Sequence, residues 1–330
     1  MIRSATHSSY PRIGDSPWDQ ELRLIARERE AGRADDEAVA IVEDEVAAMM
    51  VAEQSRAFVD VVTDGQVRWS GPFSHVASRL GGVRLNGLMR WFETGLYDRR
   101  PEIVGPIVRV APVLVRDAIH ALDVRPKALK VALPGPVSLA RVARDRAYGS
   151  VGALAAAFSA ALAEETRDLV AAGVTIVQLD EPMLCRHPED CRLVAETASR
   201  VFDAAGPKAT TILSTFFGDL AAIAGDLESL PGTHLGLDMV HGPGNWPLLA
   251  SLPEGRGLHL GLFDARTTRI ESAGEIAERI APYREILMAR DVMVGPQCGL
   301  EPIPRHAAFD KLLQSRYLRE KLQKDWRWRS

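Results

Sequence analysis

Side chains that can bind metals, orient amines or transfer protons follow most of the short apolar runs of this sequence. The clearest case is the triplet Asp180-Glu181-Pro182, which comes directly after the apolar run 174–179. Seven further polar or ionisable residues stand at comparable places: Ser9, Asp64, Gln66, Asp238, His241, Asp264 and Cys298. Carboxylates and imidazoles act as general acids and bases, and with thiolates they are metal ligands. Because an unpartnered buried carboxylate is costly, this recurrence favours one functional site.

Taken singly, each of these residues also has a structural explanation. The triplet 180–182 could cap a helix whose first turn holds the proline. Asp64 fits a turn, and Asp264 fits an ion pair with a nearby arginine. His241 fits a loop residue, and Cys298 fits a small buried side chain. Their joint placement is what raises the functional interpretation above these alternatives.

The apolar runs alternate with stretches that have helical character. Eight runs have the length and residue types of strands: 7–13, 58–64, 128–133, 174–179, 209–217, 234–240, 258–264 and 291–296. Helices are expected at 35–57, 151–172, from 272 onward and 309–328. This alternation indicates parallel βα units, and eight of them predict an α/β fold of the closed (β/α)8 TIM-barrel type. Active sites of such barrels form at the carboxyl ends of the strands, where the residues above stand.

One interval, 65–127, does not follow this pattern. It mixes glycine, proline and aromatic residues with short β-type runs. We expect it to be a lid or hairpin inserted between the second and third strands, with one helix at 111–123. Residues 1–330 are therefore predicted to form a single barrel domain.

Composition excludes several functional classes. The chain has 330 residues, a formal net charge of −4 and 46% hydrophobic residues. It lacks the basic field that holds a nucleic-acid backbone, and it has no apolar stretch long enough to span a membrane. No glycine-rich dinucleotide or P-loop motif follows any strand. Nucleic acids, membranes and nucleotide cofactors are therefore not expected partners.

Cysteine usage points to a reducing compartment. Cys185, Cys191 and Cys298 are too few for a disulfide framework, and the amino-terminal residues lack the apolar core of a secretion signal. We therefore expect a cytoplasmic protein. The spacing of Cys185, His187 and Cys191 does not match a closed zinc motif.

Seven ordered segments resemble the cobalamin-independent methionine synthase family, most of all its stand-alone single-barrel members. They are SSYPRIG (8–14), VVTDGQVRW (61–69), VALPGP (131–136), VQLDEPML (177–184), FFGDL (216–220), GLFDARTTRIESAGEI (261–276) and VGPQCGLEPIPRHAAFDKL (294–312). The resemblance covers nearly the whole chain. It implies a (β/α)8 barrel and the transfer of a methyl group to the sulfur of homocysteine.

The resemblance also implies a zinc ion that binds the substrate thiolate, with an incomplete ligand set here. Cys298 stands at one ligand position, and Asp238 stands where the family has a glutamate. His241 is a candidate third ligand. Thr215 and Phe217 occupy the positions of the family's His-x-Cys pair. Catalytic zinc uses three protein ligands and an open position, so zinc remains a possible cofactor only.

For the substrate, the resemblance implies a site built from strand ends. Asp180 matches the carboxylate that holds the amino group, and Ser9 matches the residue whose backbone meets the carboxylate. Gln66 stands where many catalytic members have a glutamate. Asp64 and Glu181 complete the expected substrate-binding set. Asp180 and Asp264 are the candidate catalytic carboxylates.

These observations predict a methyltransferase acting on homocysteine or a related small thiol. The expected methyl donor is a folate or a methyl-corrinoid, and a corrinoid protein or a second barrel chain is a candidate partner. Two alternatives stay open. One is a zinc-independent enzyme of carbon–sulfur bonds, and the other is a non-catalytic folate- or substrate-binding half that works beside a zinc-bearing partner.

Overall fold

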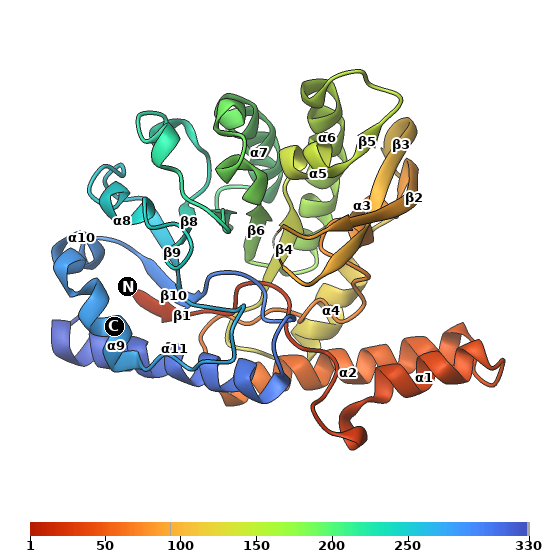
Figure 1. The fold of residues 1–330 in the computed structure, drawn as a ribbon, viewed down its shortest axis with the longest axis horizontal. Helices are drawn as coiled ribbons and strands as arrows, with labels where there is room; N and C mark the ends of the chain where they lie inside the picture. Colours follow the sequence, from red (N-terminus) through yellow and green to blue (C-terminus); the bar gives the residue numbers. More distant parts are fainter. Residues whose placement is uncertain (93, 329–330) are drawn as a thin grey trace.

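A curled parallel sheet forms the centre of the protein in the computed structural model, which describes residues 1–92 and 94–328. Within those residues the sheet has seven strands in the order β1-β10-β9-β8-β7-β6-β4, and every neighbouring pair is parallel. The strands are β1 (Ile2–Ser4), β4 (Lys130–Pro134), β6 (Ile176–Asp180), β7 (Thr210–Ser214), β8 (His234–Asp238), β9 (Gly257–Phe263) and β10 (Val292–Pro296). The parallel α/β architecture expected from the sequence is confirmed (Figure 1).

Six of the eight expected strands are present close to their predicted positions, and two predictions are wrong. Residues 7–13 are not a strand, because their backbone bonds to loops and Pro11 lacks an amide hydrogen. The regular strand lies earlier, at β1. Residues 58–64 contribute only two isolated parallel bridges, Ala5–Val61 and Val62–Leu129. These bridges join the β1 edge of the sheet to the start of β4.

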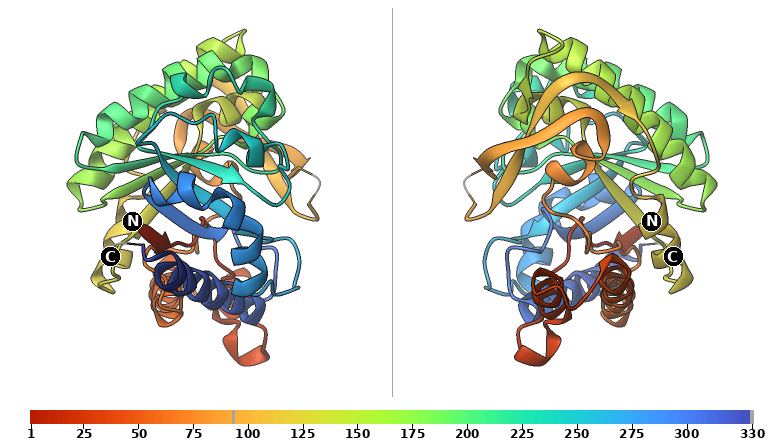
Figure 2. Two further views of the ribbon diagram at one scale, coloured as in Figure 1. Left: turned by 90° about the vertical axis from the view of Figure 1, so that its left-hand side faces the viewer. Right: turned by 90° about the vertical axis from the view of Figure 1, so that its right-hand side faces the viewer.

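Helices lie outside the sheet, and many of them pack on one another (Figure 2). They are α1 (Glu21–Glu30), α2 (Asp36–Arg56), α3 (Ser74–Ala77), α4 (Val115–Asp123), α5 (Pro136–Val142), α6 (Val151–Ala171), α7 (Cys191–Ala205), α8 (Asn245–Leu248), α9 (Ala273–Ile280), α10 (Arg284–Met288) and α11 (Arg305–Trp326). Short 3-10 turns lie at 17–19, 182–185, 188–190, 221–223, 227–229 and 281–283. Figure 2 shows the longer helices around the sheet, with α1 and α2 projecting from one end in Figure 1.

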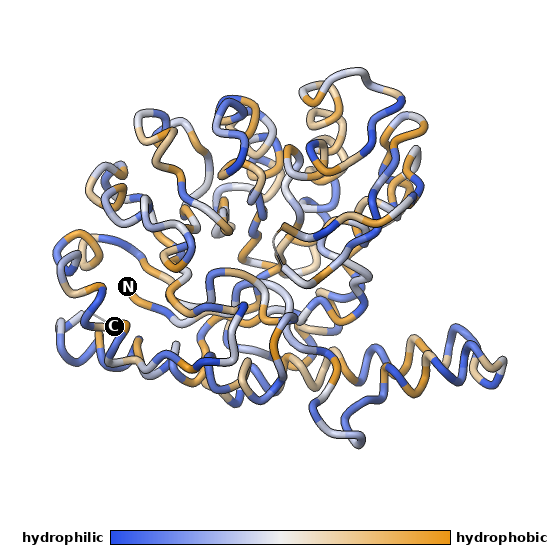
Figure 3. The backbone as a smooth tube through the Cα atoms, in the orientation of Figure 1, coloured by the Kyte–Doolittle hydropathy of each residue, from blue (hydrophilic) through white to orange (hydrophobic). Residues whose placement is uncertain are grey.

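Local sequence signals account for several helix starts. The side chains of Asp35 and Ser150 accept hydrogen bonds from the first turns of α2 and α6. Ser272 and Glu275 form a capping box at α9. Hydrophilic and hydrophobic residues alternate along α1, none of whose residues is buried (Figure 3). None of the helices in the described part of the chain is long and apolar enough to cross a membrane.

The interval 65–127 contains a long antiparallel hairpin, formed by β2 (Leu80–Arg90) and β3 (Tyr97–Arg109). The short strand β5 (Arg144–Asp145) pairs with β3. The buried carboxylate of Glu102 fastens the hairpin, because it accepts hydrogen bonds from Arg84 at 2.8 Å, from Asn86 at 2.9 Å and from Arg146. The hairpin bend therefore has a fixed base beside the carboxyl ends of the central strands.

Candidate functional site

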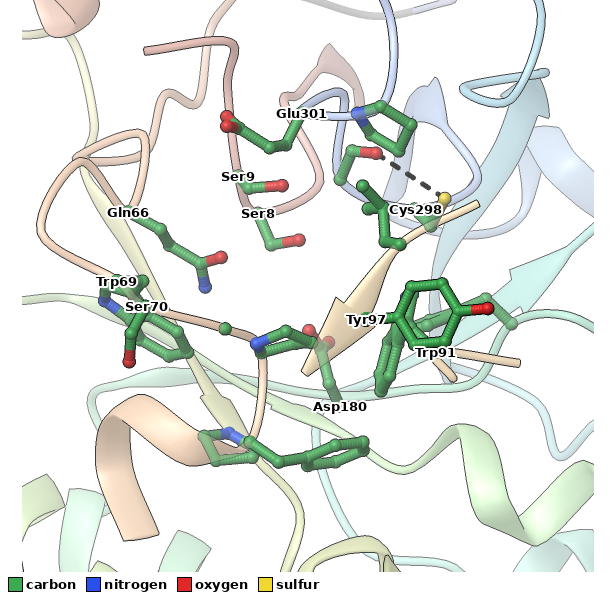
Figure 4. A pocket seen from close by; sticks show the side chains of 18 of the residues that line it. Ser8, Ser9, Gln66, Trp69, Ser70, Trp91, Tyr97, Asp180, Cys298 and Glu301 are labelled. Atoms are coloured by element: carbon green, nitrogen blue, oxygen red, sulfur yellow. Dashed lines mark hydrogen bonds between the residues drawn. The ribbon is translucent and has the colours of Figure 1, made fainter. Parts of the chain in front are cut away.

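A pocket of about 220 Å³ opens at the carboxyl ends of the central strands. Its lining comes from the loops after β1, β7 and β10, from the segment 66–73, from the ends of β4 and β6, and from the hairpin bend. Four of the residues predicted for the site line it: Ser9, Gln66, Asp180 and Cys298. Figure 4 shows Ser8, Ser9, Gln66 and Asp180 around one open space, with Trp91 and Tyr97 on another side of it.

Asp180 supplies a carboxylate at the bottom of this pocket. Its Oδ1 accepts a hydrogen bond of 2.7 Å from the amide of Gln178. Burial raises the pKa of Asp180 above its ordinary value, although the Gln178 bond and the charge of Lys130 favour the ionised form. An ionised carboxylate in such a place is a strong acceptor for a substrate ammonium group.

A second side of the pocket is aromatic. Trp91 and Tyr97 reach it from the hairpin, and Phe216 and Phe217 reach it from the loop after β7. The ring of Trp91 lies 4.6 Å from that of Phe73 and 6.2 Å from that of Phe217, measured between centroids. These rings give the cavity an apolar wall for methylene and methyl groups.

The aromatic wall was not predicted residue by residue. Its hairpin residues lie in the irregular interval 65–127. The composition of this interval predicted a lid, but nothing in the order of its residues indicated which of them contact the strand ends. Arg12 and Glu301 were also missed. Both line the pocket and form an ion pair at 3.4 Å. Their only sequence signal is their position directly after strand ends.

Glu181 and Asp64 lie outside the pocket lining. Glu181 is buried and caps α5, since its carboxylate accepts hydrogen bonds from the amides of Val137 at 2.9 Å and Ser138 at 2.8 Å. Burial raises the pKa of Glu181 to about 7. Burial, with the charge of Asp117, raises the pKa of Asp64 to about 7. The cap expected for the helical turn that begins at Pro182 is not formed by a side chain, because Glu181 binds the first turn of α5 instead.

Asp238 is fully occupied by backbone contacts. Its carboxylate accepts hydrogen bonds from the amides of Phe217 at 2.9 Å, Val240 at 2.9 Å and His241 at 2.8 Å. It therefore fixes the loops after β7 and β8. The backbone of Phe217 has a φ of 63°, in the left-handed region that is unfavourable for a bulky residue.

His241 and Asp264 form a small polar cluster beside these loops. Nδ1 of His241 lies 3.7 Å from the carboxylate of Asp238, and Nε2 lies 3.7 Å from that of Asp264. The Asp238 carboxylate, acting by hydrogen bonding and charge, raises the pKa of His241 despite partial burial. Gln297 donates a hydrogen bond of 3.2 Å to Asp264. Neither His241 nor Asp264 is part of the pocket lining.

The donor set expected for zinc is not assembled. In the described ranges 1–92 and 94–328, the only group of three or more potential ligands within reach of one ion is His187, Glu189 and Asp190, so Cys298, Asp238 and His241 do not converge. Arg141 already bonds to Asp190 at 2.6 Å, which neutralises that surface group.

The neighbouring side chains explain why the donor set fails. The Thr215 hydroxyl donates to the backbone carbonyl of Gly236 at 3.1 Å, and the phenyl ring of Phe217 has no ligand atom. Burial, together with the Asp238 and Asp264 charges, raises the pKa of Cys298 well above its ordinary value, and among the residues that the structure describes Cys298 is not grouped with two further donors. These residues do not fit a catalytic zinc ion.

Comparison with known proteins agrees with this architecture. The family model described as "Cobalamin-independent synthase, Catalytic domain" matches residues 9–215 and 237–320. The methionine synthase of Sulfurisphaera tokodaii is 27% identical over 317 residues, covering 94% of this chain and 92% of that protein. The methionine synthase of Saccharolobus solfataricus is 26% identical, covering 94% and 95%.

Solved structures share the fold. A B12-independent methionine synthase from Shewanella sp. W3-18-1, in complex with selenomethionine, aligns with a TM-score of 0.81 at 22% identity and covers 98% of both chains. A putative vitamin-B12 independent methionine synthase from Listeria monocytogenes aligns with a TM-score of 0.76 at 16% identity, covering 98% and 99%. With the family model matched over most of its length, the chain belongs to the cobalamin-independent methionine synthase family.

Proposed function

We propose that this protein is a methyltransferase that moves a methyl group to the thiol of homocysteine or a related small thiol. The observation that carries the proposal is the Asp180 carboxylate, which lies at the bottom of a cavity with an apolar aromatic side. A small amino acid with an apolar sulfur-bearing chain matches both features. The similar Shewanella structure holds selenomethionine, which is an amino acid of this class.

In this proposal Asp180 binds the substrate ammonium, while Ser9 and Gln66 border the carboxylate end. The aromatic rings exclude water from the sulfur and the incoming methyl group. The sulfur forms a bond to the methyl carbon as the bond between methyl and donor breaks, and the electron pair leaves with the donor. The thiol loses its proton; a folate donor takes up one proton on its departing nitrogen, whereas a corrinoid donor leaves with the electron pair alone and the proton goes to solvent. The donor is a folate or a methyl-corrinoid, and a corrinoid protein or second chain would deliver the latter.

A zinc-independent enzyme of carbon–sulfur bonds is the second candidate. It is favoured by Thr215 and Phe217, which cannot serve as the family's zinc ligands, and by the backbone contacts that occupy Asp238. No step of the proposed reaction is routed through zinc for the same reason. A non-catalytic half working beside a zinc-bearing chain is the remaining form of this proposal.

We further propose one barrel domain over 1–330. In it the bridging residues Val61 and Val62 take the place of the eighth strand, and the hairpin within 65–127 acts as a lid.

Purified protein tests these proposals directly. It would be incubated with L-homocysteine and either methyltetrahydrofolate triglutamate or methylcobalamin, with and without added Zn²⁺, and methionine would be measured by mass spectrometry. Methionine formation that is lost in Asp180→Asn supports the leading proposal. Homocysteine binding without turnover supports the partner-dependent form. Absence of homocysteine binding by calorimetry would overturn the thiol assignment and leave other thioethers as the substrates to test.

A further inference from the structure

A lysine is buried below the pocket and takes no part in the proposed reaction. Lys130 has no exposed surface, although lysine is rarely buried without a partner. Its Nζ donates a hydrogen bond of 2.6 Å to Oε1 of Gln178. Nε2 of Gln178 in turn donates to Oδ1 of Asp180 at 2.7 Å. A continuous chain of buried hydrogen bonds thus joins the lysine to the pocket carboxylate.

The orientation of this chain is fixed by its own chemistry. The amide of Gln178 also donates to the backbone carbonyl of His7 at 3.3 Å. Rotating the amide by half a turn would place its NH2 against the ammonium and its oxygen against a carboxylate and a carbonyl. Only the observed orientation satisfies every partner, and it requires a donor at Lys130 and an acceptor at Asp180.

The surroundings leave Asp180 as the anion that faces Lys130. A buried apolar cluster of Ala5, Val61, Ile176, Ile212 and Met293 includes the strand partner of Lys130, Ile176, and offers no anion. The neighbouring titratable groups are His7, His259 and Arg3. Burial, with the charge of Lys130, lowers the pKa of both imidazoles well below the ordinary value, so they are neutral. The guanidinium of Arg3 pairs with Asp291 at 2.7 Å.

We propose that Lys130 is a positioning residue that keeps the Asp180 carboxylate ionised and oriented for substrate, acting through the amide of Gln178. The inference rests on the proposed binding of the substrate ammonium by Asp180. Burial alone would favour the neutral acid, and the lysine charge offsets that preference without itself entering the pocket. Lys130 is accordingly absent from the residues that line the cavity.

The first test measures the pH dependence of ligand affinity by calorimetry, from about pH 5.5 to about pH 8, around the range where the buried carboxylate titrates. We expect Lys130→Met to bind L-homocysteine about tenfold more weakly near neutral pH, because loss of a nearby opposite charge shifts a carboxyl pKa by at least ~1 unit. The weakened affinity recovers as the pH rises. The exposed Lys208→Met is the matched control, and Lys130→Arg should restore much of the wild-type profile.

A ligand without an amino group distinguishes an effect on the Asp180–ammonium contact from a general disturbance of the pocket. The analogue 4-sulfanylbutanoate lacks the amino group, so its affinity should be the same in wild type and Lys130→Met. Equal weakening of both ligands at every pH would show a merely structural role and overturn the proposal.

A second test needs neither ligand nor the Lys130→Met variant. In the free protein, carbon-13 NMR would follow the Lys130 side chain, assigned by its absence in Lys130→Arg. Asp180→Asn should lower the pH at which Lys130 loses its proton, and an unchanged titration would refute the coupling. If homocysteine fails to bind wild type at any pH, the proposed function falls, while this titration still decides whether the two charges are coupled.

Discussion

Adjacent residues carry different roles at the end of β6. Side chains alternate between the two faces of a strand, so Asp180 faces the pocket while Glu181 faces α5. We expect Asp180→Asn to weaken homocysteine binding by roughly 30- to 150-fold, the effect of losing about 2–3 kcal/mol from a charged hydrogen bond. Calorimetric titration measures this loss.

Glu181→Gln is the matched control for that prediction. It replaces one acceptor of the α5 cap with a donor, which should lower the free energy of unfolding by about 1–3 kcal/mol and leave homocysteine affinity nearly unchanged. Urea denaturation measures the first effect. If Glu181→Gln abolished binding while Asp180→Asn did not, the assignment of the two carboxylates would be reversed.

The metal assignment is also decided by individual residues. We expect wild-type protein dialysed against a weak chelator to hold far less than equimolar zinc, since two of the family's ligand positions are Thr215 and Phe217. Restoring donors with Thr215→His and Phe217→Cys together should increase the zinc content measured by plasma mass spectrometry. Equimolar zinc in the wild-type protein would contradict the geometric conclusion.

At the scale of elements, the hairpin β2–β3 positions part of the aromatic wall. Glu102→Gln removes the charge that Arg84 and Arg146 contact, so we expect faster amide hydrogen exchange across 80–109 and weaker binding of substrate. Exchange measured by mass spectrometry checks the first effect. The exposed pair on α7 offers the control Glu196→Gln, which should change neither. If amide hydrogen exchange in the hairpin were unchanged in Glu102→Gln, the conclusion that Glu102 holds the hairpin strands would be wrong.

The elements themselves were largely predictable, and the reasons are local. Buried runs such as 174–179 are mostly apolar and have the length of a strand, and capped helices such as α6 carry their own start signals. Residues 7–13 and 58–64 were wrongly predicted as strands, because residue types do not reveal where a backbone finds its hydrogen-bond partners. In the site, Asp180 and Cys298 were found because parallel strands end at one edge, while Ser9 and Gln66 were found through the resemblance of their segments to the family. Trp91 and Lys130 were not, because contact across the fold leaves no spacing in sequence.

For the whole molecule, buried carboxyl groups predict an unusual dependence of stability on pH. Burial raises the pKa of Asp64 and Glu181 to about 7, so between about pH 4 and 7 the folded state holds protons that the unfolded state releases. These two carboxyl groups therefore lower the free energy of unfolding as pH rises through that window, while the imidazoles of His7 and His259, kept neutral by burial, raise it as pH rises toward about 6.5.

The acid side has the opposite sign. Hydrogen bonds from Arg146, Asn86 and Arg84 lower the pKa of Glu102 to about 2, so its stabilisation is lost as pH falls from about 4 toward 2. Urea denaturation of the wild type and of Glu181→Gln between about pH 4 and about pH 8 isolates the contribution of Glu181. The wild type should lose stability relative to the variant as pH rises toward about 7, because glutamine has no proton to release in this range. A growing stability advantage of the wild type over that range would contradict this sign.

The two isolated bridges at Val61 and Val62 have a consequence for local opening of the fold. Only a few backbone hydrogen bonds, including Thr6 to Val61 and Lys130 to Val62, connect residues 61–62 to the edges of β1 and β4. The neighbouring strands of the central sheet share longer ladders. Ser8 follows Ala5, and Gln66 follows Val62, by a few residues in the sequence. Both line the pocket. We therefore expect transient opening of the sheet to begin along this line, and a ligand that contacts both Ser8 and Gln66 should slow amide hydrogen exchange at Val61 and Val62.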